Sequence, residues 1–125
     1  AILSKDKNVE NAFYEVNVGD GGVYASIPGL LLWEKEWHRQ WADPSSLLHA
    51  MLQPSPLLDG SAPAYRFGLE VIQHAGHDVV FHSGGLWGFN TLILRIPALR
   101  MSVIHLANCE TAQPDMQQIM AAALD

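Results

Sequence analysis

The apolar residues of this chain change their spacing near Pro63, and that change limits the folds that are open to it. Before Pro63 they recur every three or four residues, as on one face of a helix. After Pro63 they alternate with polar residues or glycine, which is the two-residue repeat of a half-buried strand. The alternating residues are Tyr65, Phe67, Leu69 and Val71. The sequence therefore predicts an α+β fold, in which helices flank an antiparallel sheet.

The first predicted helix covers residues 27–37. Ser26 is a candidate N-cap, because its hydroxyl can accept a hydrogen bond from a backbone N–H of the first turn. An apolar stripe at helical spacing consists of Leu30, Trp33, Trp37 and Trp41. We expect the tryptophans to pack in the core or against another domain, and Glu34 and Glu36 to lie on the solvated face.

A shorter helix is predicted to start at Asp43 and Pro44, a common helix-start signal. Its apolar face would consist of Leu47, Leu48, Met51 and Leu52. Residues 53–63 contain three prolines and are expected to form an irregular connector.

Short turns separate the later apolar runs, which indicates an antiparallel meander. The predicted strands are residues 65–71, 79–82, 89–96 and 101–106, and the predicted turns are residues 74–78, 84–88 and 97–100. A closing helix should begin at Pro114, with an apolar face formed by Met116, Ile119, Met120 and Ala123. We expect residues 1–125 to form a single partial domain.

Composition argues against several kinds of partner. The chain has 13 acidic and 7 basic residues, a formal net charge of -6, and no cluster of Lys and Arg, so no nucleic-acid partner is expected. The longest apolar stretch, residues 27–33, contains a proline and a glycine and is far shorter than the roughly 20 residues of a membrane span. No membrane partner is therefore expected.

Metal binding is also disfavoured. Among the residues that could form a zinc site, His74 and His77 lie on a predicted turn, and Cys109 is the only cysteine. His82 would complete the set. We expect no metal and no cofactor, and we expect Cys109 to be a small buried apolar side chain.

The segment from residue 81 to residue 89 has the features of one wall of an acyl-transfer site. An apolar strand leads into His82, Ser83, Gly84 and Gly85. Glycines remove side chains where a ligand must approach closely, and they leave backbone N–H groups able to face a developing oxyanion. The simpler alternative is an ordinary hairpin turn beside a buried histidine.

Four segments together resemble the C-terminal portion of the class C β-lactamase and penicillin-binding-protein superfamily. These segments are residues 21–26, 65–69, 82–89 and 101–108. The His-x-Gly form, followed by a glycine-aromatic turn, is most similar to the D-aminopeptidases and related serine hydrolases. The resemblance implies the C-terminal part of a β-lactamase-like (DD-peptidase) α/β sandwich.

Members of this superfamily combine Ser-x-x-Lys, Tyr-x-Asn or Ser-x-Asn, and Lys-Thr-Gly or a variant of it. His82, Ser83 and Gly84 match the third motif. The resemblance implies that His82 faces the catalytic tyrosine or the substrate carboxylate region, that Ser83 binds substrate and that Gly84 leaves room for the acyl group. It also implies that the Gly85 N–H is one oxyanion donor, which is typically worth about 3 kcal/mol. Trp87 is a candidate for the wall of the substrate pocket.

A histidine in place of the usual lysine of the third motif replaces a permanent cation with a group that titrates near neutrality. A fixed positive charge suits the carboxylate of a β-lactam. The substitution therefore favours small amides or esters as substrates.

No convincing nucleophile accompanies this wall. Ser4 and Lys7 satisfy Ser-x-x-Lys, but they lie in a polar stretch, whereas the chemistry needs a buried lysine with a lowered pKa. Tyr14 and Asn17 are one residue too far apart for Tyr-x-Asn. The chain starts with neither an initiator methionine nor a signal peptide, so we expect it to begin within a longer protein.

The leading hypothesis is a segment of a serine hydrolase that cleaves amide or ester bonds through an acyl-enzyme and is inactive alone. Its expected partners are a small amide, peptide or ester substrate and the remainder of the hydrolase domain or a second chain. Self-association is a further expectation, because an interrupted sheet leaves an edge strand that invites pairing. The alternative is a non-catalytic binding or regulatory module of the same architecture.

Overall fold

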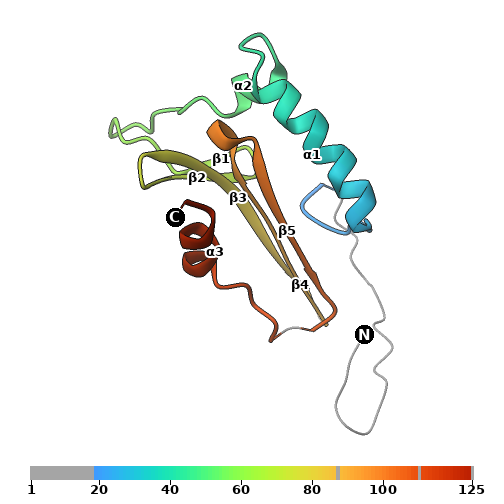
Figure 1. The fold of residues 1–125 in the computed structure, drawn as a ribbon. Helices are drawn as coiled ribbons and strands as arrows, with labels where there is room; N and C mark the ends of the chain where they lie inside the picture. The colour runs from blue at the N-terminus through green and yellow to red at the C-terminus, as the bar shows by residue number, and fades with distance from the viewer. Residues whose placement is uncertain (1–18, 87, 110, 125) are drawn as a thin grey trace, which may run out of the picture.

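The computed structural model of the protein describes residues 19–86, 88–109 and 111–124. Two helices, α1 (Ile27–Trp41) and α2 (Leu47–Met51), precede a five-stranded sheet, and α3 (Met116–Leu124) follows it (Figure 1). No helix within these ranges is both long enough and apolar enough to cross a membrane.

The sheet is an antiparallel meander in which each strand pairs with the next one along the chain. The strands are β1 (Tyr65–Arg66), β2 (Leu69–His74), β3 (His77–Leu86), β4 (Phe89–Ile96) and β5 (Met101–Ala107). A short 3-10 helix, η1 (Pro97–Leu99), connects β4 to β5. The predicted α+β fold with an antiparallel meander is confirmed.

One tight turn lies where the sequence pattern did not predict it, and another lies within the predicted turn over residues 74–78. The predicted single strand over residues 65–71 is wrong, because Phe67 and Gly68 have φ values of 46° and 83° and reverse the chain. Ala75 and Gly76, with φ values of 47° and 80°, make a second two-residue turn, so β3 begins at His77. Two-residue hairpin loops favour positive φ at both positions, and glycine at the second position supplies it at little cost.

The cap of α1 is the predicted one, but the helix is longer than expected. Ser26 Oγ accepts a hydrogen bond from the Gly29 N–H at 3.3 Å. The helix then continues to Trp41, four residues beyond the predicted end at residue 37. The added turn places Trp41 parallel to Trp37, with ring centroids 5.6 Å apart.

The two other helices start later than predicted. Helix α2 begins after Ser46, whose Oγ accepts from the His49 N–H at 3.0 Å, and not at Asp43. Helix α3 begins at Met116, because Asp115 Oδ1 accepts from the backbone N–H groups of the first turn. In both cases a polar side chain closer to the helix provides the cap.

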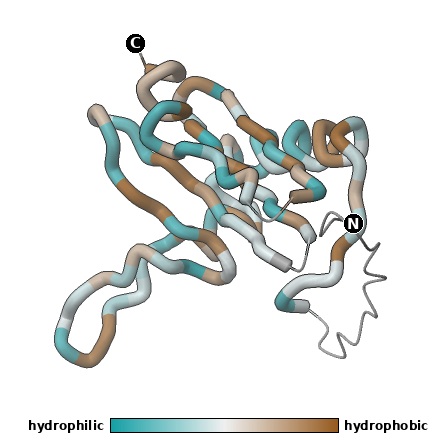
Figure 2. The backbone as a smooth tube through the Cα atoms, turned by 90° about the horizontal axis from the view of Figure 1, so that it is seen from below, coloured by the Kyte–Doolittle hydropathy of each residue, from teal (hydrophilic) through white to brown (hydrophobic). Residues whose placement is uncertain are grey.

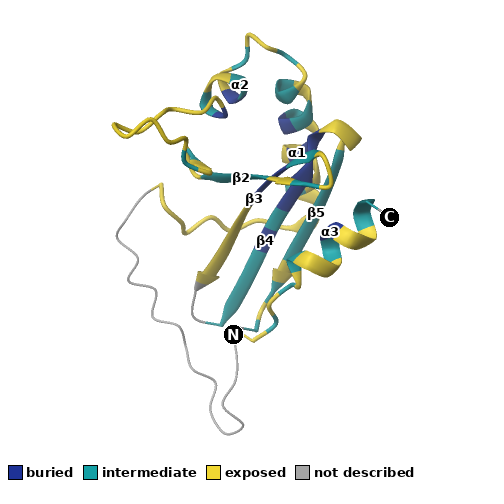
Figure 3. Cartoon of the chain, turned by 90° about the vertical axis from the view of Figure 1, so that its left-hand side faces the viewer, coloured by how far each residue is buried: buried dark blue, intermediate teal, exposed yellow. Residues whose placement is uncertain are grey.

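Helices cover both faces of the sheet, with α3 on one face and α1 and α2 on the other (Figure 1). The larger core cluster faces α3 and contains Val79, Phe81, Leu92, Leu94, Ile96 and Met120. The second cluster faces α1 and α2 and contains Trp37, Leu48, Leu52 and Val80. Hydrophobic segments lie along the strands (Figure 2), and the buried positions gather in the first half of β3 and the second half of β4 (Figure 3).

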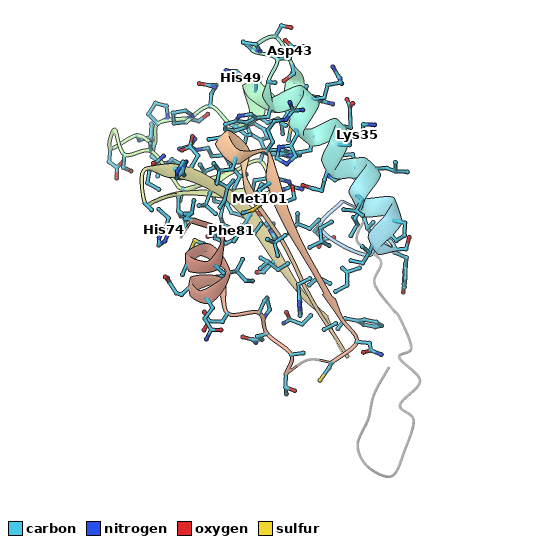
Figure 4. The ribbon with its side chains drawn as sticks, viewed as in Figure 1. Lys35, Asp43, His49, His74, Phe81 and Met101 are labelled. Atoms are coloured by element: carbon cyan, nitrogen blue, oxygen red, sulfur yellow. The ribbon has the colours of Figure 1, made fainter. Side chains whose placement is uncertain are left out.

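Side-chain directions support the two-layered core. Phe81 lies in the cluster on the α3 side, and Met101 packs against that cluster from β5 (Figure 4). Lys35 points outward from α1 into solvent (Figure 4). Trp37 is buried, but Trp33 is 59% exposed, so Trp33 does not pack in the core of the described residues, and its expected packing against another domain stays a prediction.

A buried ion pair ties α1 to the sheet. Glu34 and Arg95 are only 4% and 3% exposed, and two hydrogen bonds of 2.6 and 2.7 Å join the carboxylate to the guanidinium. The guanidinium carbon of Arg95 also lies 4.6 Å from the centroid of the Trp37 ring, a cation–π contact. The predicted solvated position of Glu34 is wrong, because a partner on β4 compensates the charge that the helix buries.

A hydrogen-bonded chain extends this pair to β5. Ser102 Oγ donates to Glu34 Oε2 at 2.7 Å, and His38 Nε2 lies 2.9 Å from Ser102 Oγ. Because the serine proton is directed to the carboxylate, the serine oxygen accepts from Nε2–H of His38. Desolvation lowers the pKa of His38, and Arg95 and Arg100 lower it further, although Glu34 acts in the opposite direction.

The buried pair predicts a large and selective loss of stability. Glu34→Gln should lower the free energy of unfolding by about 3–5 kcal/mol, because it leaves the buried guanidinium of Arg95 without a counter-charge. Denaturant unfolding followed by circular dichroism measures the change. Glu36→Gln is the matched control: Glu36 pairs with Arg39 on the exposed side of α1, and its loss should change stability little. Equal losses in the two variants would contradict the assignment.

The lowered pKa of His38 predicts a pH dependence of stability. Below its ordinary pKa of 6.5, His38 takes up a proton more readily in the unfolded chain than in the folded one, so stability falls as pH falls from 6.5 to the lowered folded value. His38→Gln should remove this part of the loss. Unfolding free energies of both proteins at pH 8, 6.5 and 5.5 provide the comparison, and parallel curves would refute the prediction.

Candidate functional site

The glycine pair lies on a strand and not in a turn. Strand β3 continues through Leu86, and Gly84 and Gly85 pair with Thr91 and Asn90 of β4. The predicted turn over residues 84–88 is therefore wrong at its start, because the chain reverses only after Leu86. This end of β3 is exposed (Figure 3).

The strand register shows which backbone groups of β3 face its open edge. Leu86 and Phe89 close a two-residue hairpin, so they form a hydrogen-bonded pair, and such pairs alternate along an antiparallel ladder. The N–H and C=O groups of Ser83 and Gly85 therefore point away from β4. On that side β2 pairs with β3 only as far as Phe81, so the register gives these groups no strand partner in the described part of the chain.

The two glycines have different surroundings. A Cβ atom on Gly84 would lie 2.6 Å from Thr91 Oγ1, whereas a Cβ atom on Gly85 would meet none of the described residues within 4 Å. Thr91 Oγ1 also donates to the Gly84 carbonyl at 3.3 Å. Gly84 is thus required by packing against β4, and Gly85 borders open space.

His82 meets a tyrosine that the sequence analysis did not assign to the site. Tyr65 Oη lies 3.1 Å from His82 Nε2, and their ring centroids are 5.8 Å apart at an angle of 62°. No pattern along the sequence links Tyr65 to His82, because the two residues are 17 positions apart and lie on different strands. Tyr65 reaches the site because the unpredicted turn after Arg66 makes β1 a separate strand at the sheet edge.

The remaining predicted residues are not all brought together. The side chain of His82 shares a face of the sheet with Val80, whereas that of Ser83 shares the opposite face with Phe81. Trp87 lies outside the described residues. So do the dismissed motif residues Ser4, Lys7, Tyr14 and Asn17.

The histidines and the cysteine that were considered as zinc ligands, and disfavoured, are not grouped in the described residues. Within residues 19–86, 88–109 and 111–124, no group of three or more His, Cys, Asp or Glu side chains is placed to hold a metal ion. Cys109 is half-buried, with its Sγ 3.2 Å from Thr111 Oγ1, so the expectation of a fully buried apolar cysteine is wrong.

Substitution of each glycine by alanine should separate the two surroundings. Gly84→Ala should destabilise the protein by about 1–3 kcal/mol, because its methyl group would overlap Thr91 Oγ1. Gly85→Ala should leave stability unchanged or slightly raised. Thermal unfolding of both variants tests this, with Gly84→Ala in a Thr91→Ala background as the control that should recover stability. Equal effects of the two single substitutions would be inconsistent with this geometry.

Comparison with known proteins places the chain beside one group of enzymes. No family model matches it. It is 35% identical over 107 residues to a D-aminopeptidase of Gluconobacter oxydans and 30% identical over 108 residues to a D-aminopeptidase of Brucella ovis. These matches cover 85% and 86% of this chain but 20% and 21% of the two relatives, so the chain spans about one fifth of their length.

The matches agree with the resemblance found in the motifs around residues 82–89. The chain is therefore similar to a segment of the D-aminopeptidases, as expected for part of a β-lactamase-like serine hydrolase.

Proposed function

We propose that this chain is part of a serine hydrolase that cleaves amide or ester bonds through an acyl-enzyme. It would form the wall of the active site that carries the third motif, His82, Ser83 and Gly84. The observation that carries the proposal is the open edge of β3, where Ser83 and Gly85 direct their backbone groups away from β4. A Cβ atom on Gly85 would meet no described atom within 4 Å, so a face of the sheet beside that edge is also open in the described part of the chain. The nucleophile would come from residues outside the described ranges or from another chain.

Each residue of the wall has a proposed task. The Gly85 N–H would donate to the oxyanion that forms when the nucleophile attacks the substrate carbonyl, and a second donor would be the nucleophile's own N–H. His82 would contact the catalytic tyrosine or the anionic end of the substrate. Ser83 would offer its hydroxyl to the substrate, and Trp87 would line the pocket. Gly84 would leave room for the acyl group, in addition to its packing against Thr91.

The relatives suggest the substrate class. They are named D-aminopeptidases, so the proposed substrates carry a D-amino acid at the N-terminus and are cleaved at the following amide bond. A histidine at position 82 in place of lysine is compatible with this choice. Such a substrate has no β-lactam carboxylate, so it needs no permanently charged partner.

An exposed apolar surface on α1 is a second observation in favour of a partner that packs against this chain. Leu31, Leu32 and Trp33 are 57%, 72% and 59% exposed, and the first half of α1 contains no charged residue. A helix that is apolar all round is normally covered on all sides. We propose that the remainder of the hydrolase domain covers it, and that residues 1–125 are a partial domain.

A chimeric enzyme tests the function. The chain would replace the matching segment of the Gluconobacter oxydans D-aminopeptidase, and the chimera should hydrolyse a D-alanine anilide and react with a fluorophosphonate. Within it, Gly85→Pro should lower kcat by about 10²- to 10³-fold, because proline removes one oxyanion donor. Gly85→Ala is the matched control, since it retains the N–H in open space.

Similar kcat values for Gly85→Pro and Gly85→Ala would contradict the oxyanion assignment. A chimera with a native-like circular dichroism spectrum that neither hydrolyses the anilide nor reacts with the fluorophosphonate would favour the non-catalytic binding module instead.

A further inference from the structure

We infer that Tyr65 is a positioning residue for His82, an inference that rests on the function proposed above. His82 lies one residue beyond Phe81, the last residue of β3 that pairs with β2. Its side chain is exposed, and no residue of β2 is paired with it. Tyr65 contacts it from β1, with its hydroxyl 3.1 Å from His82 Nε2.

The tyrosine is held firmly enough to orient another side chain. Although β1 has only two residues, hydrogen bonds anchor the chain on both sides of Tyr65, one through the backbone and one through a side chain. Before it, the Ala64 carbonyl accepts from the Val71 N–H at 2.9 Å. After it, Arg66 Nη1 donates to the Leu52 carbonyl at 2.7 Å, which ties β1 to the end of α2.

The hydrogen-bonding groups of the pair are complementary. A tyrosine hydroxyl is both a donor and an acceptor. It donates to Nε2 of a neutral imidazole that carries its proton on Nδ1, and it accepts from Nε2–H when the ring is protonated. The same contact therefore holds the His82 ring in one orientation, as its proposed contact with the catalytic tyrosine or the substrate requires.

The nitrogen signals of the histidine ring provide a direct test on this chain. We expect Tyr65 to donate to Nε2, so His82 should be enriched in the Nδ1–H tautomer in ¹⁵N-labelled protein at pH 8.5. Tyr65→Phe removes the hydroxyl but keeps the ring, so the tautomer ratio should move toward Nε2–H by about two- to tenfold. The signals of His77, at the other end of β3, should not move.

An unchanged His82 tautomer ratio in Tyr65→Phe would overturn the inference. If that variant fails to fold, His82→Gln provides the reciprocal measurement: the ¹³Cζ signal of Tyr65 should shift when its partner is replaced, and a constant signal would refute the contact.

The positioning role is then tested in the active chimera. Tyr65→Phe should lower kcat severalfold, leave KM nearly unchanged and alter the pH profile of acylation. A tautomer change without any change in kcat or pH profile would show a contact without a positioning role. Failure of the unsubstituted chimera to react would refute the proposed function, and with it the positioning role, whereas the tautomer measurement would still decide the contact itself.

Discussion

The buried ion pair between Glu34 and Arg95 is the interaction on which the arrangement of the layers depends. It joins the middle of α1 to β4, and Ser102 extends the connection to β5. A buried charge without a partner costs several kcal/mol, so α1 can slide or rotate over the sheet only if this pair is broken. Trp37 and Val80 pack beside the pair and complete the layer. The position of α1 on the sheet is therefore fixed, and so is the direction in which its exposed apolar side chains point.

Much of the architecture could be predicted from the sequence, because periodicity reports which faces are buried. The helical stripe before Pro63 and the successive apolar runs after it were sufficient for the α+β meander and for the N-cap at Ser26. The turn at Phe67 and Gly68 could not be predicted in the same way, since the alternation continues unbroken across it. Glu34 was misplaced because its partner is 61 residues away, and a local pattern carries no information about such pairs.

The part of the candidate site that lies on one strand could be predicted, because a short motif marks that strand. The motif after His82 and Ser83 indicated a stretch of backbone without side chains at Gly84 and Gly85, and the register places both glycines on β3 with the backbone of Gly85 turned to its open edge. The sequence could not distinguish a glycine required by Thr91 from one that borders open space. Nor could it reveal Tyr65, because its approach depends on a turn that only the folded chain displays.

The opposite orientation of two adjacent side chains limits how a ligand can approach β3. His82 projects from one face of the sheet and Ser83 from the other, while the backbone groups of Ser83 and Gly85 lie between them at the rim. A flat molecule resting on either face would meet only one of the two side chains. A molecule that contacts both side chains must pass around the edge of β3 from one face of the sheet to the other. An elongated, thin ligand can do so more readily than a broad one.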